Sequence, residues 1–88
     1  MNDGASEDAR GLTALGAAIQ TLRTQAGLSE PELADRAEVE IPLIGELEQG
    51  RREPTWGELR RIAQGLGTPL EQLLELAERL EEAEPGPA

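Results

Sequence analysis

The sequence lacks cysteine, histidine, lysine, phenylalanine and tyrosine altogether. Without cysteine there is no disulfide and no thiolate metal ligand, and without histidine the commonest general base and metal ligand is missing. Aromatic residues make up only 1% of the chain, and because β-branched residues are also few, the composition disfavours strands and favours helices. We therefore expect an all-α protein that is not an enzyme and that uses neither a cofactor nor a metal.

Long hydrophobic runs are also absent. No stretch approaches the length of a membrane-spanning helix, and residues 1–11 are polar and acidic, unlike a signal peptide. This pattern predicts a cytoplasmic protein that does not contact the membrane. The 88 residues carry eighteen acidic side chains against eight basic ones, all of them arginine, so the formal charge is −10. A chain of this length forms at most one domain.

Apolar residues recur at spacings of three and four, which is the period of a helix with one buried face. The first such segment covers about residues 12–25, and four further segments follow it. Each is too short to bury its apolar face alone, so the helices must share one core. We predict a compact five-helix domain at residues 12–80, with flexible tails at residues 1–11 and 81–88, where large apolar residues are few.

Helix ends are marked by capping signals. In a capping box, the side chains of a Ser or Thr and of a Glu three residues later each accept a hydrogen bond from the other's backbone N–H. Such boxes are predicted at Ser29 with Glu32, Thr55 with Glu58, and Thr68 with Glu71. The third helix is expected to begin near Ile41 or Pro42, since Pro is accepted in the first turn of a helix. Helix-ending glycines are expected at Gly27, Gly50 and Gly67.

The order of these signals is specific between Leu15 and Leu74. The residues that carry it are Arg23, Gly27, Leu28, Ser29, Leu33 and Ala34, then Leu47, Glu48, Gly50, Arg51, Arg52 and Pro54, and finally Leu59, Ala63, Leu66, Gly67, Leu73 and Leu74. In this order and spacing the chain resembles the lambda-repressor-like helix-turn-helix family, also called the Cro-like or xenobiotic-response-element family. The resemblance implies a five-helix fold and a bacterial transcription regulator whose third helix enters the major groove of DNA.

The resemblance also implies which residues would meet the DNA. The base readers would be Glu40, Ile41, Pro42, Leu43 and Glu46, and the phosphate contacts would come from Glu30, Arg51 and Arg52. Inside the domain, the resemblance implies a structural ion pair between Arg23 and Glu48 that ties the first helix to the third. One position departs from the family pattern. Glu38 stands where the turn between the second and third helices often has Gly, so it must accept a left-handed conformation or alter the turn.

The chemistry of this face leaves two functions open. Purines are read by Arg, Lys, Asn or Gln, whereas Glu only accepts hydrogen bonds and Ile or Leu can only meet a thymine methyl group. Carboxylates also oppose the phosphates, whose neutralisation supplies much of the affinity for DNA. The alternative to DNA binding is therefore an acidic protein–protein interaction module with little or no DNA binding. In that module Ile41 and Leu43 would form an apolar centre with a charged rim.

Four arginines near the third helix have two interpretations as well. Arg51 and Arg52 follow that helix, and Arg60 and Arg61 lie in the fourth. In a DNA-binding protein they would form a clamp on phosphates. Otherwise they would be solvated or would pair at helix ends with carboxylates such as Glu48, Glu53 or Glu58.

Two further surface features also have alternative interpretations. Trp56, the only aromatic residue, would either mark an interaction site or, as we predict, cover the edge of the core at the start of the fourth helix. In the fifth helix, Leu73, Leu76 and Leu80 form a possible homodimer seam. The alternative is a monomer, because the many acidic residues of this helix would repel one another in a parallel pairing.

Overall fold

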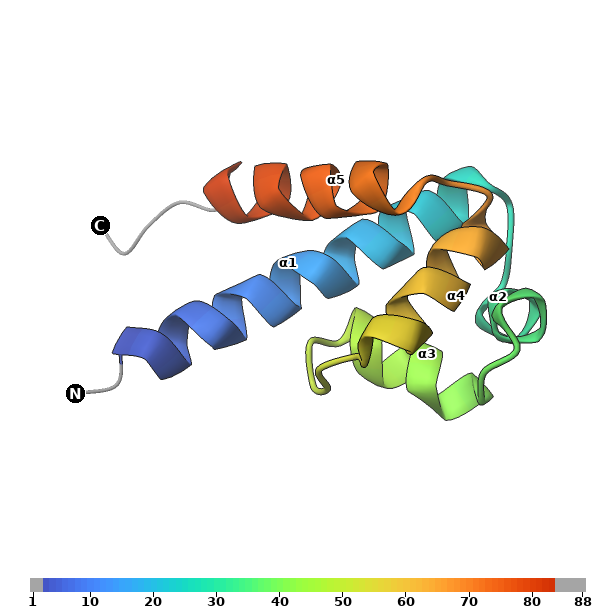
Figure 1. Cartoon of the computed structure of the whole chain (residues 1–88), viewed down its shortest axis with the longest axis horizontal. Helices are drawn as coiled ribbons and strands as arrows, with labels where there is room; N and C mark the ends of the chain where they lie inside the picture. The colour runs from blue at the N-terminus through green and yellow to red at the C-terminus, as the bar shows by residue number, and fades with distance from the viewer. Residues whose placement is uncertain (1–2, 84–88) are drawn as a thin grey trace.

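The computed structural model describes the backbone of residues 3–83 and the side chains of residues 9–83. This part of the chain contains five helices and no strand, so the predicted all-α fold is confirmed. The helices are α1 (Asp3–Gln25), α2 (Glu30–Ala37), α3 (Ile41–Glu48), α4 (Trp56–Leu66) and α5 (Leu70–Ala83). α1 and α5 pack side by side, and α2, α3 and α4 cluster beneath this pair in the view of Figure 1. Within residues 3–83, every helix is too short or too polar to cross a membrane.

The first helix is longer than its apolar pattern indicates. The predicted start at Leu12 is wrong, because α1 already begins at Asp3 and so includes most of the predicted tail. Residues 3–11 contain no proline and include three acidic residues, which the first turns of a helix favour. The period of apolar residues marks only the part of α1 that packs on the core. Of the predicted C-terminal tail, residues 84–88 lie outside the described residues, as do residues 1–2 at the other end.

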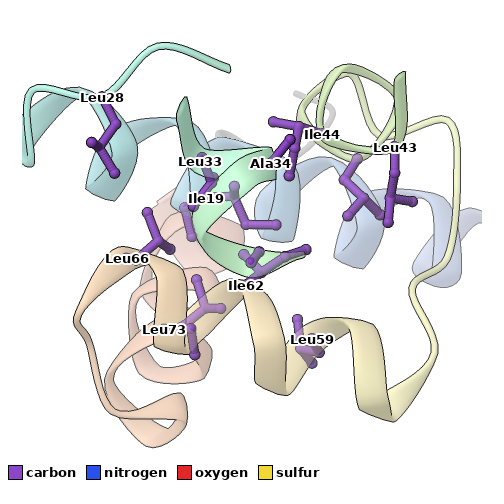
Figure 2. Close-up of a cluster of buried hydrophobic side chains, with 14 of the residues drawn as sticks. Ile19, Leu28, Leu33, Ala34, Leu43, Ile44, Leu59, Ile62, Leu66 and Leu73 are labelled. Carbon is purple, nitrogen blue, oxygen red and sulfur yellow. The ribbon is translucent and has the colours of Figure 1, made fainter. Parts of the chain in front are cut away.

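One hydrophobic core receives side chains from all five helices (Figure 2). Ile19 of α1, Leu33 of α2, Ile44 of α3, Ile62 of α4 and Leu73 of α5 are each fully buried in it. Each such side chain contributes about 1.5–3 kcal/mol relative to an exposed one. The core therefore fixes the inward side of α3 and leaves its opposite side to solvent.

Two of the three predicted capping boxes are present. The backbone N–H of Ser29 donates to Glu32 Oε1 at 2.8 Å, and that of Thr55 donates to Glu58 Oε1 at 3.0 Å, each with the reciprocal bond. The third prediction is wrong, because α5 begins at Leu70 rather than directly after Thr68. The N–H of Thr68 already donates to the Ala63 carbonyl at 3.0 Å. It closes the end of α4 and is not available for a box.

The turn between α2 and α3 follows the first of the two possibilities open for Glu38, a left-handed residue and not an altered turn. Glu38 adopts φ 59° and ψ 46°, a conformation in which any residue with a Cβ is strained. Its N–H and that of Val39 donate to carbonyls of the last turn of α2, the latter to Ala34 at 3.0 Å. Val39 then packs on the core. These contacts hold the turn tightly enough for Glu38 to be tolerated.

Candidate nucleic-acid interface

α3 is held against α1 by a partly buried ion pair. Arg23 Nε donates to Glu48 Oε2 at 2.6 Å and Nη2 donates to Oε1 at 3.0 Å, while Nη1 donates to the Leu28 carbonyl at 2.8 Å. This hydrogen bond with Glu48 raises the pKa of Arg23 above its ordinary value, although burial acts in the opposite direction. The two partners implied by the resemblance therefore meet, and they join α1, α3 and the loop before α2.

A close approach of two backbones accompanies the ion pair. A Cβ added at Gly16 of α1 would lie 2.1 Å from the Leu47 carbonyl oxygen and 2.8 Å from that of Glu48. No side chain fits there without moving one of the helices. The end of α3 is thus positioned by main-chain contact as well as by the Arg23–Glu48 pair.

The outer side of α3 exposes most of the residues that the resemblance implies as base readers. Glu40, Ile41, Pro42 and Glu46 are exposed, and Ile41 keeps 50% of its surface accessible. Leu43 is different, since only 6% of it is exposed and it belongs to the core. Its assignment as a reader, or as the apolar centre of a protein interface, is therefore wrong.

Sequence reasoning overlooked one exposed residue at the end of α3. Gln49 is exposed directly after the helix, and its backbone caps the helix by donating to the Gly45 carbonyl. A Gln side chain can bond to adenine through two atoms. Its spacing of three from Glu46 already places it close to the outward face, so this signal was available in the sequence.

The surface between α3 and α4 forms a groove of about 490 Å³. Its lining residues are Glu38, Val39, Glu40, Pro42, Leu43, Glu46, Arg52, Glu58 and Arg61. Four carboxylates therefore face two guanidinium groups. Among the residues that the structure describes, no cluster of acidic side chains could hold a metal ion. The groove has a net negative lining, which opposes the approach of phosphate groups.

The arginines beside α3 differ in how far they are already engaged. Arg52 contacts Glu46 at 3.4 Å and Glu58 at 3.5 Å, so the predicted pairing with Glu58 occurs. Within the described residues, the exposed side chains of Arg51, Arg60 and Arg61 form no ion pair. Their guanidinium groups are open to an anion.

Glu30 lies in the first turn of α2, beside α3. A Cβ built on Gly45 would be 3.6 Å from Glu30 Oε1. The charge of Glu30 also contributes to raising the pKa of Arg23. The carboxylate is thus close to the α1–α3 junction, where it adds negative charge next to the exposed side of α3.

Two surface predictions outside this groove need correction. Leu73 is fully buried, so it cannot belong to a homodimer seam. Leu76 and Leu80 are only partly buried and pack against the core, so any seam is limited to their exposed parts. Trp56 does not cover the edge of the core as predicted, since 62% of it is exposed.

A helix-turn-helix domain model matches residues 14–76 of the chain, and the protein therefore belongs to this helix-turn-helix family. The clp gene regulator ClgR from C. glutamicum has a similar structure, with a TM-score of 0.74 and 32% identity over 78% of this chain and 90% of that one. The restriction-modification controller protein C.AhdI from Aeromonas hydrophila has a TM-score of 0.69 and 27% identity, over 70% of this chain and 94% of its own.

More distant structures share the fold. The restriction-modification controller protein C.Esp1396I has a TM-score of 0.74 and 21% identity, over 80% of this chain and 91% of that one. No curated protein sequence matches the chain. The resemblance to lambda-repressor-like helix-turn-helix proteins is confirmed by the family match and by these neighbours.

Proposed function

We propose that this protein is a bacterial transcription regulator that binds DNA through α3 and the arginines beside it. The observation that carries the proposal is the arrangement of α2, the Glu38 turn and α3, which fixes one side of α3 in the core and presents the other to solvent. The similarity to ClgR, a gene regulator, and to C.AhdI, a restriction-modification controller, supports the same function. Such a regulator acts in the cytoplasm, as the sequence predicts.

The exposed residues suggest how the contacts would be divided. Arg51 and Arg61 would bind phosphates, and Arg52 would join them after exchanging its carboxylate partners for a phosphate. Gln49 is the one exposed residue of this region able to read adenine by paired hydrogen bonds, and Ile41 suits a thymine methyl group. Glu40 and Glu46 would repel phosphates, so sequence selection would rest on few direct contacts.

The salt dependence of binding tests this proposal. With so few arginines, the slope of log affinity against log salt should be shallow, at about −2 to −4 per domain. The measurement is fluorescence anisotropy with labelled genomic fragments over a range of salt concentrations. Arg51→Ala combined with Arg52→Ala should abolish binding. Arg79→Ala in α5, which makes no substantial contact with α3, is the control for removing an arginine away from this face.

The outcomes of this experiment are distinct. A steep slope with tight binding at physiological salt would mean that the DNA-facing residues are assigned incorrectly. If no fragment binds even at low salt, the protein is not a DNA-binding regulator of this kind.

A second function is favoured by one specific observation. Four carboxylates line the α3–α4 groove and two of them hold Arg52, so this face resembles an acidic protein-interaction surface. In that case DNA would not be retained, and a basic partner would bind through Ile41 and the surrounding acids. Ile41→Ser should then release a co-purifying partner without unfolding the domain, because Ile41 is already half exposed.

A further inference from the structure

The outer face of α4 exposes the largest apolar side chain of the protein to solvent. Trp56 occupies the first position of α4, directly after the N-cap residue Thr55, and 62% of it is exposed. It is absent from the residues that form or flank the core. A single exposed apolar residue is ordinary on a protein surface. The residues around Trp56 therefore decide whether this exposed side chain belongs to a binding site.

Two hollows lie along the same side of α4. The first, of about 240 Å³, includes Trp56, Arg60 and Gln64 together with Pro69 and Leu70 at the start of α5. The second, of about 230 Å³, shares Arg60 and Gln64 with the first and adds Gly57 and Arg61. Residues four apart on a helix are neighbours, so these side chains form one continuous surface, the Trp56 face, made of Trp56, Gly57, Arg60, Arg61 and Gln64.

The Trp56 face differs in charge from the rest of the protein. No carboxylate is among the residues that line its two hollows, whereas two arginines are. The acidic residue of α4, Glu58, is engaged elsewhere, since it accepts from the backbone of Thr55 and contacts Arg52. In a chain of formal charge −10, a surface without acidic groups selects for an anionic ligand.

The shape and lining of the first hollow indicate what kind of anion fits. At about 240 Å³ it is smaller than the pockets of roughly 300–1,000 Å³ that take small molecules. Trp56, Ala63, Pro69 and Leu70 give it apolar walls, and Arg60 stands beside them. An apolar centre with a charged margin is the arrangement of a protein interface, in which Trp and Arg provide the strongest anchors.

We propose that the Trp56 face is a docking site for an acidic segment of a partner protein, with one apolar side chain of that segment seated between Trp56 and Leu70. Carboxylates of the segment would pair with Arg60 and Arg61. No residue of α3 lines either hollow, and Arg61 is the one side chain that the Trp56 face shares with the α3–α4 groove. Trp56 and Arg60 lie outside that groove, so binding at these two residues is tested separately from DNA binding.

The protein contains a direct reporter of this site. Trp56 is the only tryptophan and tyrosine is absent, so all intrinsic fluorescence above 300 nm arises at the proposed interface. The probe is a short capped peptide of leucine and glutamate. Its binding should shift the Trp56 emission to shorter wavelength and protect it from acrylamide, because the indole leaves water.

Three variants test the contacts, with the peptide labelled and followed by anisotropy. Arg60→Ala should weaken binding about tenfold, as loss of an anchoring arginine does. Trp56→Ala should remove binding, and circular dichroism should show an intact helical domain because Trp56 is outside the core. Arg79→Ala removes the same charge from α5 and should leave peptide affinity unchanged.

Control ligands separate the possible occupants. A peptide with glutamine in place of every glutamate should not bind, because the arginines then have no partner. The proposal is overturned if this neutral peptide binds equally well, if the acidic peptide leaves the emission unchanged, or if Arg60→Ala binds as tightly as the parent. Tighter binding of oligothymidylate than of the acidic peptide would also overturn it, in favour of a nucleic-acid site.

Discussion

Two arginines each link a carboxylate of α3 to another part of the fold, and they do so in different environments. Arg23 donates two hydrogen bonds to Glu48, at 2.6 and 3.0 Å, and the two side chains are 12% and 5% exposed. Arg52 touches Glu46 at 3.4 Å, with exposures of 48% and 49%. The same pair of functional groups is therefore a structural element on the inner side of α3 and an exchangeable contact on the outer side.

The largest difference is expected in stability. Arg23→Ala should destabilise the domain by about 3 kcal/mol, because it leaves Glu48 buried without its partner. Arg52→Ala should cost less than about 1 kcal/mol, as is usual for an exposed pair. Urea unfolding followed by far-ultraviolet circular dichroism measures both. Equal effects of the two substitutions would mean that burial does not separate the two pairs.

A glycine substitution separates the ion pair at this junction from the main-chain contact. Gly16→Ala leaves Arg23 and Glu48 unchanged but places a Cβ 2.1 Å from the Leu47 carbonyl, which should cost about 1–3 kcal/mol by overpacking. Gly57→Ala in α4 is the control, since nothing lies within 4 Å of its added Cβ. The control should be neutral or gain up to about 1 kcal/mol from helix propensity. If both variants melted alike, the close approach of α1 and α3 would carry no energetic weight.

On the outer side, Glu58→Gln tests whether the carboxylates hold Arg52 back from DNA. Gln can still accept the Thr55 N–H in a capping box, so the fold is preserved while the charge contact is lost. DNA affinity should rise by about threefold, the equivalent of one weak surface pair. Anisotropy titrations of both proteins at the same salt concentration measure the change. Glu53→Gln removes an equal charge from a loop residue that lines no part of the groove and should have a smaller effect.

The smallest effect concerns a carboxylate held by the backbone instead of by an arginine. The Ser29 N–H, followed by the Ser29 hydroxyl, lowers the pKa of Glu32 below its ordinary value of 4.5. Because the pKa of Glu32 is lower in the folded protein, its carboxylate stabilises the fold at a pH above the pKa of the unfolded state. This stabilisation is lost as the pH falls through the pKa of the folded state. Thermal unfolding of Glu32→Gln should therefore differ most from the parent near neutral pH. A difference that grew in acid would contradict this sign.

Local chemistry explains why helix boundaries were mostly predictable from the sequence. The boxes at Ser29 and Thr55 and the left-handed residues Gly27 and Gly67 depend on neighbours within a few residues. The box at Thr68 failed because that N–H serves the preceding helix instead. Local signals conflict where two helices meet within so few residues, and sequence alone does not rank them.

The surface was harder to predict than the boundaries. Leu43 was placed outward by its position in the family pattern, although its spacing of four from the buried Leu47 indicates the inner side. Trp56 was expected to be covered because it is large and apolar, but the first position of α4 lies beyond the core. The partners of Arg52 depend on the distance between α3 and α4. Such facts belong to the packed structure and have no local signature.

The packing of α1 on α5 has a consequence for how the protein is made. α1 makes its largest contact with α5, the last of the described helices. During translation α1 therefore leaves the ribosome well before α5 has been synthesised. The contacts of α2 with α3 and α4 involve residues 30–66 alone and become available earlier. We therefore expect the nascent chain to collapse first around the helix-turn-helix segment, with the apolar side of α1 needing protection until α5 emerges.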